Sequence, residues 1–398
     1  MASILKLIVF SVLGICITVA EAAGESLPIV AGGGAGEGLG PYVQKADAAS
    51  PPIFKFGGFG TLGVSHSSQA LGDYVLDGTI PKGAGLSNSL SWGNDSRIGA
   101  QLTANFTHRI SAVLQVVSEY GADSTYRPKV EWANVKYAFT PDVYVRVGRI
   151  ALPTFMNADS RKVGYSYPWV HPPTDLYRQL SITNSDGMDA SYRLVIGEAE
   201  NIIKIIYGRN INERPTSTST ARNMRGIFDT IEYGPASIRI GYQARDSSFL
   251  NHLTGVASAW HTSSDLSIGA TYNPGDWFVM SEWMQRKSTT KASAMYVSAG
   301  CRINKFTPYL TYSQNSPSSS QPGFPAPTVS AITNAARIQN TISLGARWDF
   351  MKNADFKLQL DQVRLSDNSN GYLANIPAGV TLYGTRFNVI TAVLDFLF

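Results

Sequence analysis

The residues best suited to catalysis or metal binding are thinly spread along this chain of 398 residues. Its five histidines are His66, His108, His171, His252 and His261. None of them belongs to an H-E-x-x-H sequence, and no G-x-S-x-G motif marks a nucleophilic serine. The glycine runs at 32–34 and 57–60 do not open a helix, so they are not phosphate-binding loops. We therefore predict no catalytic, cofactor-binding or metal-binding residue.

Charged side chains, in contrast, recur at alternate positions of short apolar segments. Between 96 and 107, Ile98 and Leu102 share one parity, and Arg97 and Thr103 share the other. Successive side chains of a β-strand point to opposite faces, so each segment has one apolar and one polar face. The chemistry that this pattern favours is a wall of fixed charges facing water, which selects passing solutes.

The polar faces carry ten basic and four acidic side chains. The basic ones are Lys55, Arg97, Lys136, Arg146, Arg193, Lys204, Arg239, Arg245, Arg347 and Lys357. The acidic ones are Glu119, Asp189, Glu282 and Asp361. A Lys or Arg turned toward lipid at mid-bilayer costs about 2–4 kcal/mol, so in a membrane these charges are expected to face inward. The basic excess predicts a mild preference for anions.

Sixteen segments of this kind follow one another from Ile53 to the last residue. We predict strands near 53–64, 96–107, 110–121, 129–139, 143–152, 186–196, 202–210, 225–234, 237–248, 262–272, 277–287, 292–303, 307–315, 337–350, 356–366 and 385–398. Short turns alternate with longer polar loops, such as 65–95, 153–185, 316–336 and 367–384. This layout, with an even strand number, is typical of bacterial membrane barrels. We predict an all-β fold: a transmembrane antiparallel β-barrel of about 16 strands, with short periplasmic turns and long extracellular loops.

Aromatic residues mark one end of the predicted strands. Those that end a strand before a short turn or at the C-terminus are Phe106, Phe139, Tyr233, Tyr272, Phe350 and Phe398. Their common height predicts an aromatic girdle at one membrane interface.

The chain begins with the features of an export signal. Lys6 precedes an apolar run from Leu7 to Val19, and Ala20-Glu21-Ala22 fits a cleavage site. We predict a cleaved signal peptide at 1–22, with retention as an anchor the weaker alternative, a flexible Gly/Ala-rich leader at 23–52 and the barrel at 53–398. No later window holds about 18 consecutive apolar residues, so a helical membrane protein is not expected. The net charge of +4 is too small to predict nucleic-acid binding.

Four short stretches resemble the general porin family of Gram-negative outer membranes. They are Phe56 to Leu62 (FGGFGTL), Asp95 to Gly99 (DSRIG), Tyr144 to Leu152 (YVRVGRIAL) and the last strand, Asn388 to Phe398. The resemblance covers most of 53–398 in layout. It implies an outer-membrane location, a homotrimer, and a last strand whose Phe396 and Phe398 signal to the barrel-assembly machinery. The expected function is passive diffusion of ions and small hydrophilic solutes.

The same resemblance implies that the loop after the fifth strand folds into the lumen and narrows it. Here the loop runs from Pro153 to Ser185, and its charged constriction candidates are Asp159, Arg161, Lys162, Asp175 and Arg178. The pore-lining residues expected around it are Arg97, Lys136, Arg146, Arg193, Arg239, Arg245, Arg347, Glu119, Glu282 and Asp361. The segment from Tyr165 to Asp175 lacks the acidic PEFGG-like motif of the family, so the identity of the constriction residues stays open.

Two other functions remain open on the sequence. In a substrate-specific channel, loop aromatics would grip a sugar or aromatic solute; the alternative, which we favour, is that they pin the loop to the wall. These aromatics are Tyr165, Tyr167, Trp169 and Tyr177. A barrel enzyme of the phospholipase or protease type would need Ser, His and Asp together near the outer rim. The partners expected are the lipid bilayer, the assembly machinery and small solutes, with no cofactor and no nucleic acid.

Overall fold

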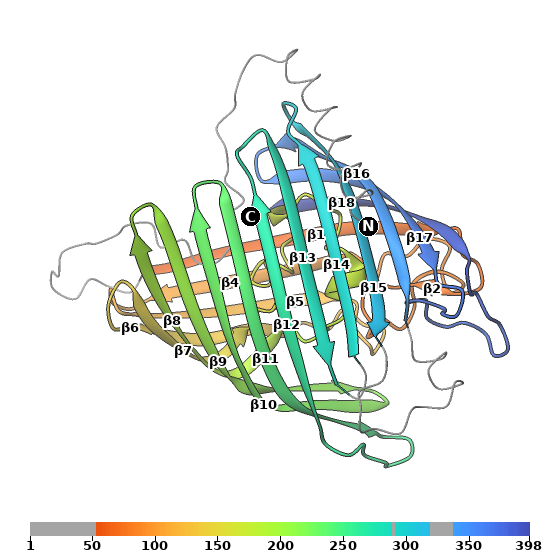
Figure 1. Ribbon diagram of the computed structural model, residues 1–398, viewed down its shortest axis with the longest axis horizontal. Helices are drawn as coiled ribbons and strands as arrows, with labels where there is room; N and C mark the ends of the chain where they lie inside the picture. Colours follow the sequence, from red (N-terminus) through yellow and green to blue (C-terminus); the bar gives the residue numbers. More distant parts are fainter. Residues whose placement is uncertain (1–52, 289–290, 319–336) are drawn as a thin grey trace.

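Residues 53–288, 291–318 and 337–398 are described in the computed structural model of the protein. The predicted signal peptide and leader lie outside these residues. Sixteen antiparallel strands form one closed barrel, in which β1 pairs with β18 to complete the wall (Figure 1). The prediction of an all-β barrel of about 16 strands is therefore confirmed.

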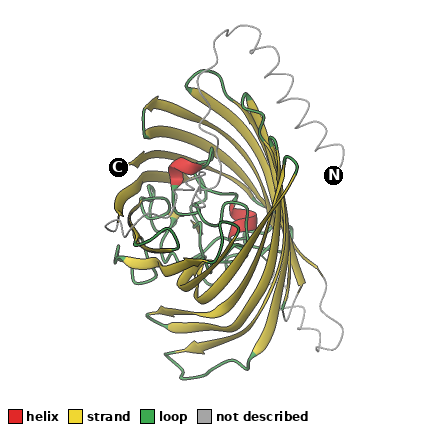
Figure 2. Ribbon diagram, turned by 90° about the vertical axis from the view of Figure 1, so that its left-hand side faces the viewer, coloured by secondary structure: helices red, strands yellow, loops and turns green. Residues whose placement is uncertain are grey.

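The strands and helices have the following bounds. The barrel strands are β1 (Ile53–Ser67), β4 (Arg97–Asn105), β5 (Ile110–Glu119), β6 (Lys129–Ala138), β7 (Val143–Ala151), β8 (Asn184–Ile196), β9 (Ala199–Arg214), β10 (Ser217–Tyr233), β11 (Ala236–Asn251), β12 (His261–Tyr272), β13 (Trp277–Lys287), β14 (Lys291–Cys301), β15 (Phe306–Ser318), β16 (Gln339–Met351), β17 (Ala354–Leu365) and β18 (Arg386–Leu397). Two further strands, β2 (Asp73–Tyr74) and β3 (Ala84–Gly85), pair inside the first long loop. The short helices η1 (Gly164–Ser166) and α2 (Thr174–Tyr177) lie in the loop between β7 and β8, and Figure 2 shows both inside the ring of strands.

Residue parity decides which face of the barrel each side chain occupies. On β4, Ile98 and Leu102 point outward and are 51% and 39% exposed. Ile240 on β11 and Ile342 on β16 are exposed in the same way. Among the described residues, no helix is long and apolar enough to cross a membrane. The outer surface of the wall is an apolar belt, as the alternation predicted.

The end of the barrel with the short turns, here the short-turn end, carries exposed aromatic rings. Phe139, Tyr233 and Phe398 are each more than half exposed. Phe306 stacks on Trp348 with ring centres 5.8 Å apart, which extends the set beyond the residues that the sequence indicated. These rings form the predicted girdle around the apolar belt.

The opposite end, here the long-loop end, differs from the expectation at one hairpin. β9 continues to Arg214 and β10 begins at Ser217, so a two-residue turn replaces the long polar loop expected between these strands. Polar side chains such as Thr218 and Thr220 interrupt the apolar alternation by which this part of β10 could have been predicted. Their backbone groups still form hydrogen bonds with the neighbouring strands. The loops at 68–96, 152–183 and 366–385 match their predictions closely. The loop expected at 316–336 lies largely outside the described residues.

Glycines of β1 make room for aromatic rings of β18 where the barrel closes. Gly60 pairs in register with Phe396, and a Cβ on Gly60 would overlap the Phe396 ring. The Gly58 N–H donates to the Phe398 carbonyl at 2.7 Å, and the Phe398 N–H donates to the Gly58 carbonyl at 3.0 Å. The Phe398 ring covers Gly58 in the same way. In the FGGFG run, Gly58 and Gly60 therefore leave room for the rings of Phe398 and Phe396 of the last strand.

Replacing Phe398 with Asp should sharply lower the yield of assembled barrel, because it removes the ring that covers Gly58 at the closing seam. The yield can be measured in the membrane fraction as the band that changes mobility on heating in a detergent gel. Phe139→Asp is the matched control, since Phe139 is equally exposed but lies in a turn away from the seam. Equal yields for wild type and Phe398→Asp would show that the terminus is not the assembly signal.

Candidate functional site

The loop between β7 and β8, residues 152–183, occupies the barrel lumen and is called the inserted loop below. Four of its aromatic rings are at most 2% exposed: Phe155, Tyr167, Trp169 and Tyr177. They belong to an apolar cluster on the inner face of β13, β14 and β15. The Trp169 Nε1–H donates to Ser298 Oγ at 2.8 Å, and its ring meets Tyr296 edge-on at 5.5 Å. These contacts pin the loop to one side of the wall.

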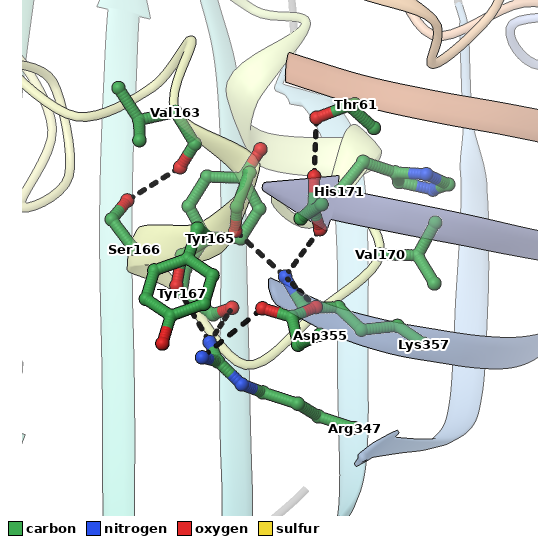
Figure 3. A network of polar contacts seen from close by, with 12 residues as sticks. Thr61, Val163, Tyr165, Ser166, Tyr167, Val170, His171, Arg347, Asp355 and Lys357 are labelled. Atoms are coloured by element: carbon green, nitrogen blue, oxygen red, sulfur yellow. Dashed lines mark hydrogen bonds and ion pairs between the residues drawn. The ribbon is translucent and has the colours of Figure 1, made fainter. Parts of the chain in front are cut away.

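Charged wall residues hold the first part of the inserted loop by its backbone (Figure 3). The Lys357 ammonium donates to the Gly164 carbonyl at 2.7 Å and lies 2.9 Å from Asp395. The Arg347 guanidinium donates to the Tyr165 carbonyl at 2.7 Å and lies 3.1 Å from Asp355. Because the cations are paired with carboxylates, they bind the loop carbonyls without leaving a net buried charge.

Two features show how closely the loop fits the wall. A Cβ on Gly164 would overlap the carboxylate of Asp395, so only glycine allows this approach. Glu282 on β13 accepts hydrogen bonds from the Met156 N–H at 2.8 Å and from the hydroxyls of Tyr177 and Tyr296 at 2.8 and 2.9 Å. The wall therefore fixes both the backbone and the aromatic rings of the loop.

Two charged constriction candidates of the loop are buried away from open space. Asp175, in α2, accepts hydrogen bonds from Ser313 at 2.8 Å and Gln339 at 2.7 Å. Burial raises the pKa of Asp175 to about 6, although these hydrogen bonds act to lower it. Arg178 donates to the carbonyls of Val75 and Tyr372, and burial, with a smaller effect of Arg337, lowers its pKa to about 10. Both residues anchor the loop, which corrects their expected position at the constriction.

His171 forms a third buried attachment of the inserted loop. Its Nδ1 lies 3.1 Å from Asp95, and its Nε2 lies 3.8 Å from Asp361 on β17. Burial alone would lower the pKa of His171, but the two carboxylates outweigh it and raise this pKa above 6.5. His171 thus ties the inserted loop to Asp361 of the wall and to Asp95, which lies two residues before β4.

A cavity of about 450 Å³ lies at the long-loop end, between the inserted loop, the loop that precedes β4 and the long-loop ends of β4, β5, β6 and β9. Its lining holds five basic and five acidic side chains: Arg97, Lys129, Arg149, Arg161 and Lys162, and Asp77, Asp95, Glu119, Glu131 and Glu213. Lys162 Nζ lies 2.5 Å from Glu119, so one ion pair crosses from loop to wall. Arg161 donates to two carbonyls of its own loop. Groups of both signs therefore line the cavity.

Asp159 of the inserted loop is directed toward a basic part of the wall. Burial acts to raise its pKa, but Lys204, Arg146 and Arg239 outweigh burial and lower it. Arg239 also donates to the Phe155 carbonyl at 2.8 Å. An acidic loop group thus faces basic wall groups at this point of the lumen.

The predicted pore-lining residues lie on inward strand positions, but most are engaged with partners. Arg146 pairs with Asp189 at 2.5 Å, and Arg245 pairs with Asp265 at 2.5 Å. Arg193 pairs with Asp142 near the short-turn end. Those that contact the inserted loop are Arg239, Arg347, Glu282 and Asp361. Lys136 lies over the Tyr144 ring, with its Nζ 5.6 Å from the ring centre, and Arg97 and Glu119 line the cavity. Their role in conduction stays a prediction.

Asp355 and Asp395 are site residues that the sequence did not single out. Both are fully buried and compensate Lys357 and Arg347. Asp395 also accepts a hydrogen bond from Thr61 across the closing seam. The sequence could have identified Asp395 as a lumen-facing acid, because it lies at an inward position between the apolar residues Leu394 and Phe396.

Three histidines of the described region contact an acid, a hydroxyl and a carbonyl in separate places. His171 binds Asp95, His252 contacts Thr218 at 2.8 Å, and His66 contacts the Ser89 carbonyl at 2.7 Å. Within residues 53–288, 291–318 and 337–398, no group of three or more His, Cys, Asp or Glu side chains could hold a metal ion.

Comparisons with known proteins give a likeness of fold. No protein-family model matches the chain, and no curated protein matches it by sequence. Among solved structures, the anion-selective porin from Comamonas acidovorans matches with a TM-score of 0.58 and 15% identity, covering 87% of this chain and 100% of that one. A loop L8 deletion mutant of OmpT, an outer membrane protein of Vibrio cholerae, gives 0.57 and 12%, covering 88% and 100%. The outer membrane channel DcaP of Acinetobacter baumannii gives 0.55 and 11%, covering 89% and 100%. The chain therefore has the fold of these outer-membrane barrels.

Proposed function

We propose that the protein is an outer-membrane channel for passive diffusion of ions and small hydrophilic solutes. The observation that carries the proposal is the inserted loop, which narrows the lumen but leaves a charged cavity of about 450 Å³ beside it. The apolar outer belt and the aromatic girdle fit a barrel that lies in a bilayer. The likeness to porins and channels supports the same function.

The positions of the loop aromatics and of the charged groups suit a general channel more than a substrate-specific one. Of the four loop aromatics that would grip a solute, Tyr167, Trp169 and Tyr177 are instead buried against the wall. The fourth, Tyr165, is half-buried under the Arg347 guanidinium. The acid Asp159 opposite a basic wall creates a field across the lumen, which screens solutes by charge and dipole. We also expect a homotrimer, as one solved form of OmpT is a trimer, and assembly by the outer-membrane machinery.

In planar bilayers with a salt gradient, the protein should conduct ions, and its reversal potential should indicate a mild anion preference. Arg97 lines the cavity, whereas Arg146 and Arg347 form ion pairs away from it, so Arg97 is the wall cation to test. Arg97→Gln should move the reversal potential toward cations, because a charge beside a narrow cavity acts strongly on a passing ion.

Arg109→Gln is the matched control, since Arg109 is an exposed residue in a short turn outside the lumen. It should leave the reversal potential unchanged. The absence of conductance would contradict the channel proposal, and a clear cation preference of the unmodified protein would show that acidic groups dominate the narrowest point.

A further inference from the structure

A cluster of arginines lies on the outer face of the barrel, on the side of β9 and β10 that faces away from the lumen. Arg209 on β9 and Arg222 and Arg225 on β10 are exposed, and β9, β10 and β11 lie side by side (Figure 1). Arg209 has the parity of Ile205 and Tyr207, which are more than half exposed. These three residues, called the arginine cluster below, therefore point away from the lumen.

A β-bulge in β10 creates the cluster. The register with β9 shifts between Ala221 and Met224, and both of these side chains are buried inside the barrel. The intervening Arg222 and Asn223 consequently both turn outward, and Asn223 adopts a left-handed φ of 51°. Without the bulge, Arg222 and Arg225 would have opposite parity, so one of them would face the lumen.

An aromatic ring orients the cluster, and two acidic side chains, Asp186 and Asp246, lie beside it. Arg222 stacks on Trp260, with its guanidinium carbon 3.7 Å from the ring centre. Asp186, the register partner of Arg209, is already bound by Arg149 at 2.6 Å. Asp246, the register partner of Arg222, accepts hydrogen bonds from Asn223 at 2.8 Å and Thr262 at 2.9 Å. This carboxylate offsets one of the three arginines, and the cluster keeps a net positive charge.

The position of the cluster along its strands indicates which layer of the membrane surrounds it. Arg209 lies about ten residues along β9 from Ala199 at the short-turn end, and a strand needs about 9–11 residues to cross the hydrocarbon. Arg225 lies about eight residues from Tyr233 of the girdle, with the exposed apolar Ile227 below it. In the proposed orientation, Arg209 and Arg222 therefore lie at the headgroup level of the outer leaflet, and Arg225 lies just below them.

We propose that the arginine cluster binds the phosphorylated headgroup of an anionic glycolipid in the outer leaflet. Arginine guanidinium groups bind phosphate oxygens through two parallel hydrogen bonds, which suits a headgroup with phosphate on a sugar. β9 and β10 continue above the cluster to Arg214 and Ser217, so the wall stands beside a tall headgroup. Asn223, Tyr207 and Trp260 supply polar and aromatic contacts for the sugar. This inference rests on the proposed outer-membrane location.

The test uses the purified full-length protein and fluorescent lipopolysaccharide as the probe. Replacing Arg209, Arg222 and Arg225 together with glutamine should weaken binding on the order of a hundredfold, since each arginine in direct contact with the anionic headgroup contributes roughly fivefold. Arg364→Gln with Arg386→Gln is the matched control: both are exposed arginines at the long-loop ends of β17 and β18, away from the bulge. This control should bind nearly as the wild type does.

Three outcomes would overturn the inference. One is equal weakening in the control, which would indicate unspecific attraction; another is equal binding of dephosphorylated lipopolysaccharide or of phosphatidylglycerol vesicles. The third is a change of oligomeric state in the triple variant, measured by sedimentation, which would make the cluster a contact between copies of the chain. Conductance in planar bilayers is measured on the same samples. Lost binding with normal conductance supports the inference, and a wild type that binds but does not conduct contradicts the channel proposal alone.

Discussion

Replacing Lys357 with methionine should destabilise the folded barrel by about 3–5 kcal/mol, the range for removing one partner of a buried ion pair. Lys357 is fully buried, and its ammonium lies 2.9 Å from Asp395 and 3.7 Å from Asp355. Asp355 keeps Arg347 at 3.1 Å, so Asp395 is the carboxylate that loses its counterion. Methionine fills a similar volume, which separates the loss of charge from the loss of packing. The free energy of unfolding can be measured by urea titration in lipid vesicles.

The double variant Lys357→Met with Asp395→Asn should recover most of the lost stability, because a neutral side chain leaves no buried charge without a partner. Both variants also remove the hydrogen bond to the Gly164 carbonyl. They should therefore share a noisier single-channel current, since one attachment of the inserted loop is gone. If the double variant is as unstable as Lys357→Met, the stabilisation comes from packing and not from the ion pair.

The barrel could be predicted because each strand carries its own local signal. On β4, the apolar Ile98 and Leu102 alternate with the polar Arg97 and Thr103, which indicates a strand with one face in water. The β9–β10 hairpin could not be predicted above Asn210, because its polar residues near the turn show no apolar alternation there. This segment is β-strand because its backbone pairs with the neighbouring strands, and the polarity of its side chains does not indicate that pairing.

The site was only partly predictable because strand parity says where a side chain points and not what it meets. Parity placed Arg146, Arg347 and Glu282 inside the barrel, where the structure has them. It did not show that Arg347 and Glu282 hold the inserted loop. Asp175 and Arg178 were expected at the constriction because they are charged residues of the loop that narrows the lumen, yet tertiary contacts bury both. The Gly164 carbonyl could not be found from the sequence at all, since every residue has one.

Replacing Leu102 with arginine should impair insertion of the barrel, whereas Thr103→Arg, one residue along β4, should fold and change the conductance. Leu102 points outward between Phe56 and Leu114 of the neighbouring strands, within the apolar belt. An arginine there costs about 2–4 kcal/mol when it faces lipid near mid-bilayer. Thr103 has the opposite parity and faces the lumen, where an arginine is solvated by water.

The two variants carry the same new charge on adjacent residues, so each is the control for the other. The fraction of heat-modifiable barrel in the membrane should fall for Leu102→Arg and stay near wild type for Thr103→Arg. In planar bilayers, Thr103→Arg should also shift the reversal potential toward anions, because it adds a cation beside the solute path. Equal tolerance of both changes would mean that the outer face of β4 does not lie in lipid. The same result would remove the physical basis for the girdle, for the height assigned to the arginine cluster and for the proposed location of the protein.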